Sequence, residues 1–184
     1  TAIGYQAGYA NTTAQITAVG AQALVANTTG SHNAALGFQA LSFNTTGNYN
    51  VAIGNFDSTN YAVMNLNTTG SNNTAVGAGS LAKNTTASGN TAVGYQSLYS
   101  NAGAGVSLVA VGHQAGYSFN GGGSNQAQVF IGKSAGYFNV SGIDNTYVGG
   151  YAGYNATGSY NTALGSGALL SQTSASSNTA VGYQ

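Results

Sequence analysis

The chain has 184 residues, and its 2% of charged side chains sum to a formal net charge of zero. This charged fraction is far below the roughly one quarter found in globular domains, and it excludes the basic surface of a nucleic-acid-binding protein or of a membrane-surface helix. The absence of Cys excludes disulfides and thiolate metal sites, whereas 13 Tyr, 6 Phe and regularly spaced aliphatic residues argue against disorder.

One motif recurs along the whole chain. It is most complete at residues 90–96, which read Asn-Thr-Ala-Val-Gly-Tyr-Gln. The Gly of this motif, called the register Gly below, recurs at intervals of 16 to 23 residues, most often 17. The register Gly residues are Gly4, Gly20, Gly37, Gly54, Gly77, Gly94, Gly112, Gly132, Gly149, Gly165 and Gly182. A period of this kind predicts a stack of similar structural units.

Each repeat has the same elements in the same order. A Thr-Ala-Val segment (residues 91–93) ends at the register Gly, a second short segment follows (residues 96–99), and an Asn-Thr-Thr-Gly-Ser corner (residues 67–71) closes the repeat. Gly, Asn and Ser favour turns, and the frequent Gly and β-branched residues leave no helical stripe. The longer repeats add residues at 60–65 and 121–123, which predicts loops on a regular scaffold.

Stacking is required because one 17-residue coil cannot bury its own aliphatic side chain. We therefore predict an all-β fold, a parallel β-solenoid or β-roll of about ten coils of ~17 residues. Strands about 4.8 Å apart would make a rod roughly 48 Å long. Residues 1–184 are expected to form a single repetitive segment, a window of a longer fibre protein, because the chain opens partway through the motif.

The aliphatic residue before each register Gly is the most regular apolar position, and we expect it to form the buried core column. Its members are Ile3, Val19, Leu36, Ile53, Val76, Val93, Val111, Ile131, Val148, Leu164 and Val181. The preceding Ala lies on the other face of the strand, where small side chains would let a second chain approach closely. The Ala residues expected at this contact are Ala18, Ala52, Ala75, Ala92 and Ala180.

Asn recurs four residues before the register Gly. Side chains stacked in register form an amide hydrogen-bond ladder, as in cross-β assemblies, and a row of ligand-binding amides is the alternative. We favour the ladder because these positions are corners beside the starts of strands. The residues are Asn33, Asn50, Asn73, Asn90, Asn145, Asn161 and Asn178.

Aromatic residues recur just after the register Gly and again five residues after it. Packing between coils is one interpretation of these rows. The other is a platform for sugars, because Tyr joins an apolar face to a polar tip. The candidate glycan-contact residues are Tyr5, Tyr95, Tyr99, Tyr117, Tyr137 and Tyr154.

The glycosylation motif Asn-x-Ser/Thr recurs on the Asn-Thr-Thr corner, where we expect the side chain to be exposed to a glycosylating enzyme. In a chain so rich in Asn and Thr, the motif also arises from composition alone, so unmodified Asn is the alternative. The candidate acceptors are Asn11, Asn27, Asn44, Asn67 and Asn84.

Residues that could support catalysis are nearly absent. Asp57 and Asp144 are about five coils apart, so stacking would separate them by roughly 24 Å, too far for a carboxylate pair. His32 and His113 are similarly separated, and we find no phosphate-binding loop or calcium-binding repeat. No apolar run is long enough to cross a membrane. We therefore expect a protein that is not an enzyme and that holds no cofactor and no metal.

Residues 73–77 (Asn-Thr-Ala-Val-Gly) and 1–7 (Thr-Ala-Ile-Gly-Tyr-Gln-Ala) resemble the head repeat of trimeric autotransporter adhesins and of related phage tail-fibre-like and bacterial surface fibre proteins. The resemblance covers essentially the whole chain, although these repeats are a few residues longer and vary in length. It implies a homotrimer of left-handed parallel β-rolls, extracellular, on a cell surface or virion fibre. The implied partners are other copies of the chain and cell-surface glycans or polysaccharide, with no nucleic acid and no membrane contact.

We therefore expect a structural or adhesive segment of an extracellular fibre, an adhesin head or shaft that mediates attachment or acts as a rigid spacer. One alternative is a functional-amyloid-like matrix subunit. Another is an ice-binding solenoid, which uses flat Thr-x-Thr arrays. Ice binding is disfavoured because the strand Thr is followed by Ala-Val and the corner places neighbouring Thr on opposite faces.

Overall fold

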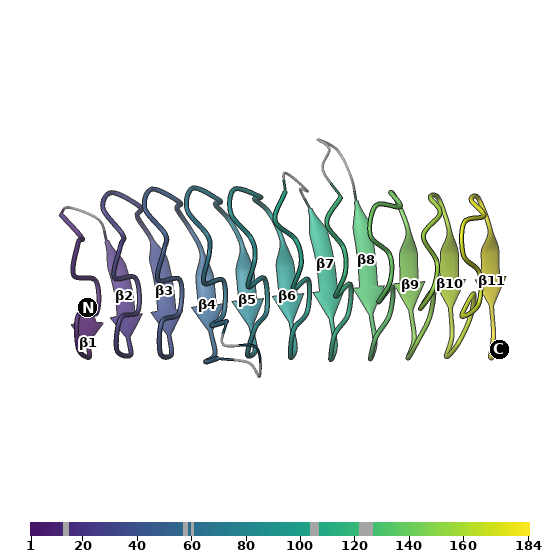
Figure 1. The fold of residues 1–184 in the computed structure, drawn as a ribbon, viewed down its shortest axis with the longest axis horizontal. Coiled ribbons are helices and arrows are strands. Elements are labelled where there is room, and N and C mark those ends of the chain that lie inside the picture. The colour runs from purple at the N-terminus through teal and green to yellow at the C-terminus, as the bar shows by residue number, and fades with distance from the viewer. Residues whose placement is uncertain (13–14, 57–58, 60, 104–106, 122–126) are drawn as a thin grey trace.

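The computed structural model describes residues 1–12, 15–56, 59, 61–103, 107–121 and 127–184. Every regular element in these ranges is a β-strand, and the strands form one 11-stranded sheet (Figure 1). The strands are β1 (Ala2–Ile3), β2 (Ile16–Val19), β3 (Asn33–Leu36), β4 (Val51–Ile53), β5 (Thr74–Val76), β6 (Thr91–Val93), β7 (Leu108–Val111), β8 (Gln128–Ile131), β9 (Thr146–Val148), β10 (Thr162–Leu164) and β11 (Thr179–Val181). Each strand pairs in parallel with the next, which confirms the predicted β-solenoid.

The pairing register keeps equivalent residues of the motif in columns. Ala75 pairs with Ala92 between β5 and β6. The register also survives the two longest repeats, where Ala52 pairs with Ala75 and Ala110 with Phe130. The pairing register is therefore unaffected by the extra residues. The prediction of a loop over residues 60–65 is wrong, because Val63 and Met64 are completely buried in the core. Of the residues singled out in those repeats, Asn60, Asp57 and Gly122–Gly123 lie outside the described ranges.

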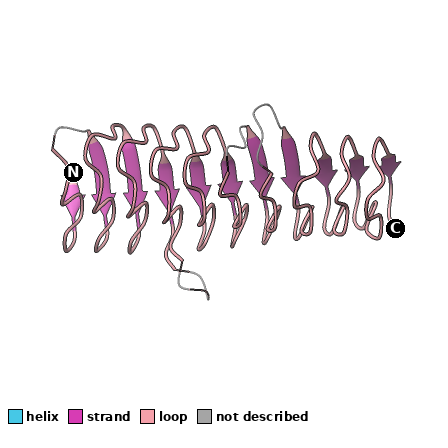
Figure 2. Cartoon of the chain, turned by 45° about the horizontal axis from the view of Figure 1, so that its top comes forward, coloured by secondary structure: helices cyan, strands magenta, loops and turns pink. Residues whose placement is uncertain are grey.

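Only the first of the two segments in each repeat is a strand; the second is a run of turns on the other side of the coil (Figure 2). Some backbone N–H groups bond three residues back, as Ala7 N does to Gly4 O at 3.2 Å, and others bond the next coil, as Leu24 N does to Ala40 O at 3.1 Å. Leu24 has a φ of +52° and Gln22 of +58°. These left-handed conformations cost roughly 1–2 kcal/mol per residue, which the bonds between coils offset.

The register Gly is needed because the coils approach most closely there. Gly94 has a φ of +128°, and a Cβ at this position would lie 2.4 Å from the carbonyl oxygen of Gly112. No other residue fits without moving the backbone of the next coil. The Gly column thus sets how tightly successive coils stack.

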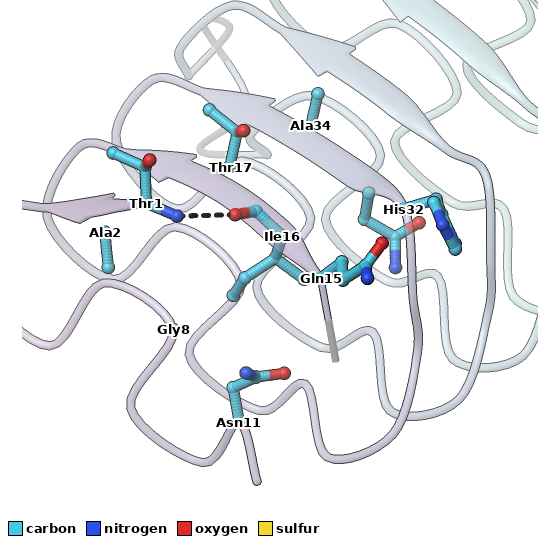
Figure 3. Close-up of a pocket in the computed structure, with 10 residues that line it drawn as sticks. Thr1, Ala2, Gly8, Asn11, Gln15, Ile16, Thr17, His32 and Ala34 are labelled. Atoms are coloured by element: carbon cyan, nitrogen blue, oxygen red, sulfur yellow. Dashed lines mark hydrogen bonds between the residues drawn. The ribbon is translucent and has the colours of Figure 1, made fainter. Parts of the chain in front are cut away.

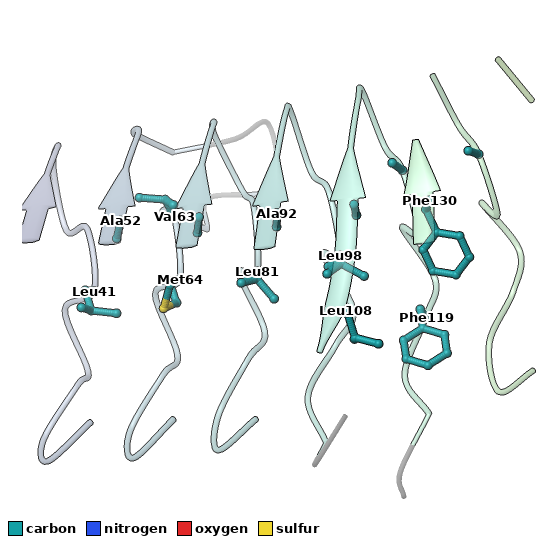
Figure 4. Packing of buried hydrophobic residues seen from close by; sticks show 14 of the residues in the cluster. Leu41, Ala52, Val63, Met64, Leu81, Ala92, Leu98, Leu108, Phe119 and Phe130 are labelled. Carbon is teal, nitrogen blue, oxygen red and sulfur yellow. The ribbon is translucent and has the colours of Figure 1, made fainter. Parts of the chain in front are cut away.

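The core lies between the strands and the turn layer, and the Ala of the motif fills it. Ala92 is completely buried, whereas its strand neighbours Thr91 and Val93 are only partly buried. Figure 4 shows Ala52 and Ala92 with a row of larger side chains from the turn layer. These larger core residues are Leu24, Leu41, Met64, Leu81 and Leu98. Because Leu already fills the narrow coil, the facing strand position has room only for Ala.

The predicted core column is therefore wrong. Alternation along a strand allows only one of two neighbours to point inward, and here the aliphatic residue before the register Gly points outward. The most exposed members of that column are Ile3, Leu36, Ile53, Val111, Ile131, Leu164 and Val181, and Val19, Val76, Val93 and Val148 are partly exposed. The predicted contact between chains through Ala is wrong for the same reason: Ala18, Ala52, Ala75 and Ala92 are buried inside their own coils, and Ala180 is partly buried against the same core.

Two coils exchange the sizes of their facing core residues. Phe130 and Tyr147 take the place of Ala on β8 and β9, and Gly136 and Gly153 take the place of Leu in the turn layer. A Cβ on Gly136 would lie 2.4 Å from Cδ1 of Phe130, and one on Gly153 would lie 2.5 Å from Cδ2 of Tyr147. The large and small residues have changed sides while the coil stays filled.

Candidate functional site

The outward face of the sheet is a regular apolar surface, called the outer face below. It consists of the aliphatic column and, beside it, the first residue of each Thr-Ala-Val segment. No strand in the described part of the chain contains a charged residue. Leu36 and Leu164 are 49% and 48% exposed. A row of exposed and partly exposed aliphatic side chains on a charge-free sheet is unusual for a soluble monomer, which makes the outer face a candidate interaction surface.

Thr and the aliphatic residue share this face, because Ala between them points inward. The Thr residues of the outer face are Thr17, Thr74, Thr91, Thr146, Thr162 and Thr179. In the remaining paired rows from β2 to β11 this position is Ala34, Val51, Val109 or Val129. The Thr row is therefore interrupted twice, once at β3–β4 and once at β7–β8.

Four of the predicted glycan-contact residues form a stacked ladder in the turn layer. Successive ring centroids from Tyr99 through Tyr117 and Tyr137 to Tyr154 are 5.1, 4.9 and 5.3 Å apart, with interplanar angles of 6°, 6° and 24°. The inner rings, Tyr117 and Tyr137, are therefore covered on both faces, and only their edges point outward. Packing between coils explains this ladder, and none of its inner rings offers a face to a sugar.

The other two glycan candidates lie away from the ladder. Tyr5 is exposed on the first coil. Tyr95 stacks on His113 of the next coil at 5.2 Å, and His32 stacks on Tyr49 at 4.9 Å in the same manner. The two predicted His are thus separate, each bound to a ring of a neighbouring coil.

A cluster called the aromatic patch continues the ladder at its C-terminal end. It consists of Lys133, Tyr137, Phe138, Tyr151 and Tyr154. Phe138 contacts Tyr137 and Tyr154 edge to face, with centroids 4.7 and 5.2 Å apart. Tyr151 contacts Tyr154 at 5.6 Å, and the Lys133 ammonium lies 5.3 Å from the Tyr151 centroid. Hydrogen bonding to Tyr151 raises the pKa of Lys133, and burial together with the neighbouring Tyr154 raises the pKa of Tyr137.

The sequence did not single out Phe138, Tyr151 and Lys133, because few repeats carry an aromatic or a cationic residue in the same columns. Phe138 lies six residues after its register Gly, where most repeats carry a small or polar residue. The available signal was two Tyr in the adjacent column, Tyr137 and Tyr154, which stacking was bound to bring beside it.

The Asn-Thr-Thr corner is a second amide ladder, and this contradicts its predicted role as an exposed glycan acceptor. Nδ2 of Asn67 donates to Oδ1 of Asn44 at 2.7 Å and to the carbonyl of Gly70 at 3.0 Å. The same pattern joins Asn27 to Asn11, Asn44 to Asn27 and Asn84 to Asn67. Asn27, Asn44, Asn67 and Asn84 are fully buried. Only Asn11 at the end of the ladder is partly exposed.

The ladder predicted before the strands is confirmed. Asn90 Nδ2 donates to Asn73 Oδ1 at 3.1 Å, and Asn73 Nδ2 donates to Asn50 Oδ1 at 3.2 Å. Asn73 Oδ1 also accepts the backbone N–H of Asn90 at 3.0 Å, whereas Asn90 Oδ1 accepts that of Leu108 at 3.2 Å, where the Asn row is interrupted. These amides are occupied in holding coils together, which leaves no open ligand row among them.

Buried polar atoms without a partner gather where the corner ladder is interrupted. Phe119 occupies the ladder position between Asn101 and Asn139, and the Asn101 Oδ1 and both side-chain polar atoms of Asn139 have no hydrogen-bond partner. The Tyr147 hydroxyl is also unpartnered. Burial raises its pKa to about 12, although nearby Asn161 and Asn139 act in the opposite direction.

A cavity of about 670 Å³ lies beside the first two coils, and its lining includes Asn11, Gln15 and His32 (Figure 3). The Thr1 amino group donates to the Ile16 carbonyl across it at 2.8 Å. His32 is its one titratable side chain. Across the described ranges there is no group of three His, Asp or Glu side chains placed to hold a metal, and no helix that could cross a membrane.

No family model, curated protein or solved structure matches the chain.

Proposed function

We propose that the chain is a rigid, non-enzymatic segment of an extracellular fibre on a cell surface or virion, and that parallel copies pack together through the outer face. One observation carries the proposal: the aliphatic column is exposed on a sheet without charge. The copies are homotrimers of left-handed rolls, as the adhesin resemblance implies. This replaces the Ala column with the outer face as the surface between chains.

The gain from covering the outer face is substantial because it repeats in every coil. Leu36 and Leu164 keep about half of their surface exposed, so burying the rest of each stabilises an assembly by roughly 1 kcal/mol. The gain grows with every row, and no ion has to lose its water. A solenoid that stayed monomeric would be expected to carry charged residues on this face.

Rigidity follows from the continuous sheet, which joins every coil to the next, and from the two amide ladders, which reinforce the coils that they span. Added coils lengthen such a rod without requiring a new core. The chain also contains only two Lys and no Arg, so it offers few cleavage sites to trypsin-like proteases outside a cell. These properties suit an adhesin shaft or head, whether it binds a surface or acts as a spacer.

Ice binding is the second candidate, because Thr and the aliphatic residue share a flat face after all. The interruptions at Ala34, Val51, Val109 and Val129 remove the hydroxyl from four rows, which favours contact with a second chain over ordered water. A thermal hysteresis assay separates the two. A functional-amyloid-like subunit would instead seed fibrils in solution.

Sedimentation equilibrium of the 184-residue chain tests the assembly. We expect a mass about three times the 18.2 kDa of one chain. The double variant Leu36→Lys with Ile131→Lys should sediment with the mass of a single chain. Its circular dichroism spectrum should match that of the wild type. Thr46→Lys with Thr69→Lys adds the same charge on exposed corners and should leave the trimer intact. A folded wild-type chain that sediments as a monomer would refute the proposal.

A further inference from the structure

We propose that the aromatic patch is a binding site for an acidic oligosaccharide, with one sugar ring stacked on Phe138 and a carboxylate of the same oligosaccharide paired with Lys133. The inference rests on the adhesive role proposed above and gives it a ligand class. It differs from the expected row of Tyr platforms, because the inner rings of the ladder cover one another.

The geometry leaves one face of Phe138 free. Both faces of Tyr137 are covered, by Tyr117 at 4.9 Å and by Tyr154 at 5.3 Å. Phe138 meets Tyr137 at 76° and Tyr154 at 82°, so it must lie across the edges of these two rings. One face of Phe138 therefore rests on the ladder and the other points outward, and its side chain is 45% exposed.

Such a ring is a suitable platform for a sugar. The aromatic face carries partial negative charge, and the C–H groups on one face of a pyranose ring carry partial positive charge, so the two attract and also exclude water. Contact with two Tyr edges holds Phe138 in place before the ligand arrives, which lowers the entropy lost on binding.

Lys133 gives the patch its preference for an acid. Its ammonium lies over Tyr151, which contacts Tyr154, so the cation and the platform belong to one contiguous surface built from two neighbouring coils. The one acidic residue within the described ranges is Asp144, whose Oδ1 accepts the backbone N–H of Ala127 at 3.0 Å. An exposed cation beside an aromatic platform favours a carboxylate on the ligand.

A nucleic acid is a poorer fit for the same surface. Binding of single strands requires a track of cations along the backbone together with stacking platforms, whereas the patch has one Lys and one open ring. A uronic acid supplies one carboxylate and one apolar ring face. The patch also lies in the turn segments, so association of copies through the strands leaves it accessible.

The chain provides matched controls for both residues. Phe43 holds the equivalent position, six residues after its register Gly, and is 54% exposed. Its ladder-column neighbours are Ser42 and Asn65 rather than Tyr. Lys83 lies 5.0 Å from the centroid of Tyr99, a ring that is almost completely buried. Phe43 thus tests for an exposed ring alone, and Lys83 for a cation over Tyr without an open platform.

Isothermal titration calorimetry measures the affinity of the whole chain for trigalacturonate and, separately, for maltotriose as a neutral probe. Phe138→Ala should weaken trigalacturonate binding about tenfold, and Phe138→Leu, which keeps the apolar volume, should weaken it almost as much. Lys133→Gln should weaken trigalacturonate about threefold to tenfold and leave maltotriose unchanged. Phe43→Ala and Lys83→Gln should change neither by more than about twofold.

Equal losses from the control variants, or trigalacturonate binding that survives both Phe138→Leu and Lys133→Gln, would overturn the site. Absence of trigalacturonate binding to the wild-type chain would overturn it as well. Sedimentation of the same samples keeps the two proposals apart. A trimer that binds no saccharide leaves a spacer without this site, whereas a monomer that binds trigalacturonate retains the site and refutes the assembly.

Discussion

Exchanging Phe130 with its facing Gly tests directly how the coil is packed. Phe130→Ala removes a completely buried ring and should lower the free energy of unfolding by about 3–5 kcal/mol. Gly136→Leu in the wild-type background should cost at least about 1–3 kcal/mol by overpacking, because even its Cβ would lie 2.4 Å from the Phe130 ring. Leu tolerates this backbone, since Leu81 and Leu98 adopt a φ of +47° at equivalent positions.

The double variant Phe130→Ala with Gly136→Leu rebuilds the Ala-against-Leu arrangement of the other coils. We expect its loss of unfolding free energy to be smaller than the sum of the two single losses by at least about 2 kcal/mol. Recovery should be incomplete, because Phe130 also fills the space beside Gly116, where a Cβ would lie 2.5 Å from its ring.

Urea unfolding followed by circular dichroism measures the cycle, with one m value confirmed for all variants. Phe130→Ala with Gly153→Leu is the control, because Gly153 faces Tyr147 instead, and no rescue is expected there. If the free-energy losses of Phe130→Ala and Gly136→Leu are additive in the double variant, the proposed exchange of large and small partners across the coil is refuted.

Three further predictions concern the core, the corner ladder and the buried phenol. Ala163→Asp should unfold the chain, whereas Leu164→Asp should keep its circular dichroism spectrum, because the two neighbours are 0% and 48% exposed; equal effects would contradict the assignment of faces. Asn67→Ala should cost more than about 2 kcal/mol in urea unfolding because it leaves buried amides unpaired, while Thr69→Ala on the exposed corner should cost under about 0.5 kcal/mol. The folded Tyr147 keeps its proton up to a pKa of about 12, whereas the unfolded side chain loses it near 10, so stability should fall by about 2–3 kcal/mol as pH rises from about 10 to 12. Tyr147→Phe should remove that part of the pH dependence, and an unchanged profile would show that other groups cause it.

The sequence by itself determined the stacked architecture. A recurring Gly followed by polar corners leaves no helical stripe, and coils of this length bury apolar side chains only by stacking in register. The Asn row before the strands was predictable for the same reason, since equal positions of successive coils must meet.

The direction of each strand side chain was decided only by the tertiary structure. Ala92 and Val93 are both apolar and alternate, so a periodic pattern cannot tell which one faces inward. The width of the coil settles the choice, because Leu98 and its equivalents enter from the turn layer and leave space for Ala alone. A local sequence motif could not reveal which residue faces inward, because it contains only neighbours in sequence. It does not contain the turn-layer side chain that fills the space across the coil.

Burial of the corner Asn and exposure of Phe138 have the same origin. An Asn-Thr-Thr turn is exposed when it stands alone, but Asn67 lies between the amides of the coils before and after it and is covered by them. Phe138 has no aromatic equivalent in the adjacent coils, so the Tyr ladder beneath supports one of its faces while nothing stacks on the other. Contacts between coils, which vary from repeat to repeat, therefore determine where this regular rod buries an amide and where it exposes an aromatic face.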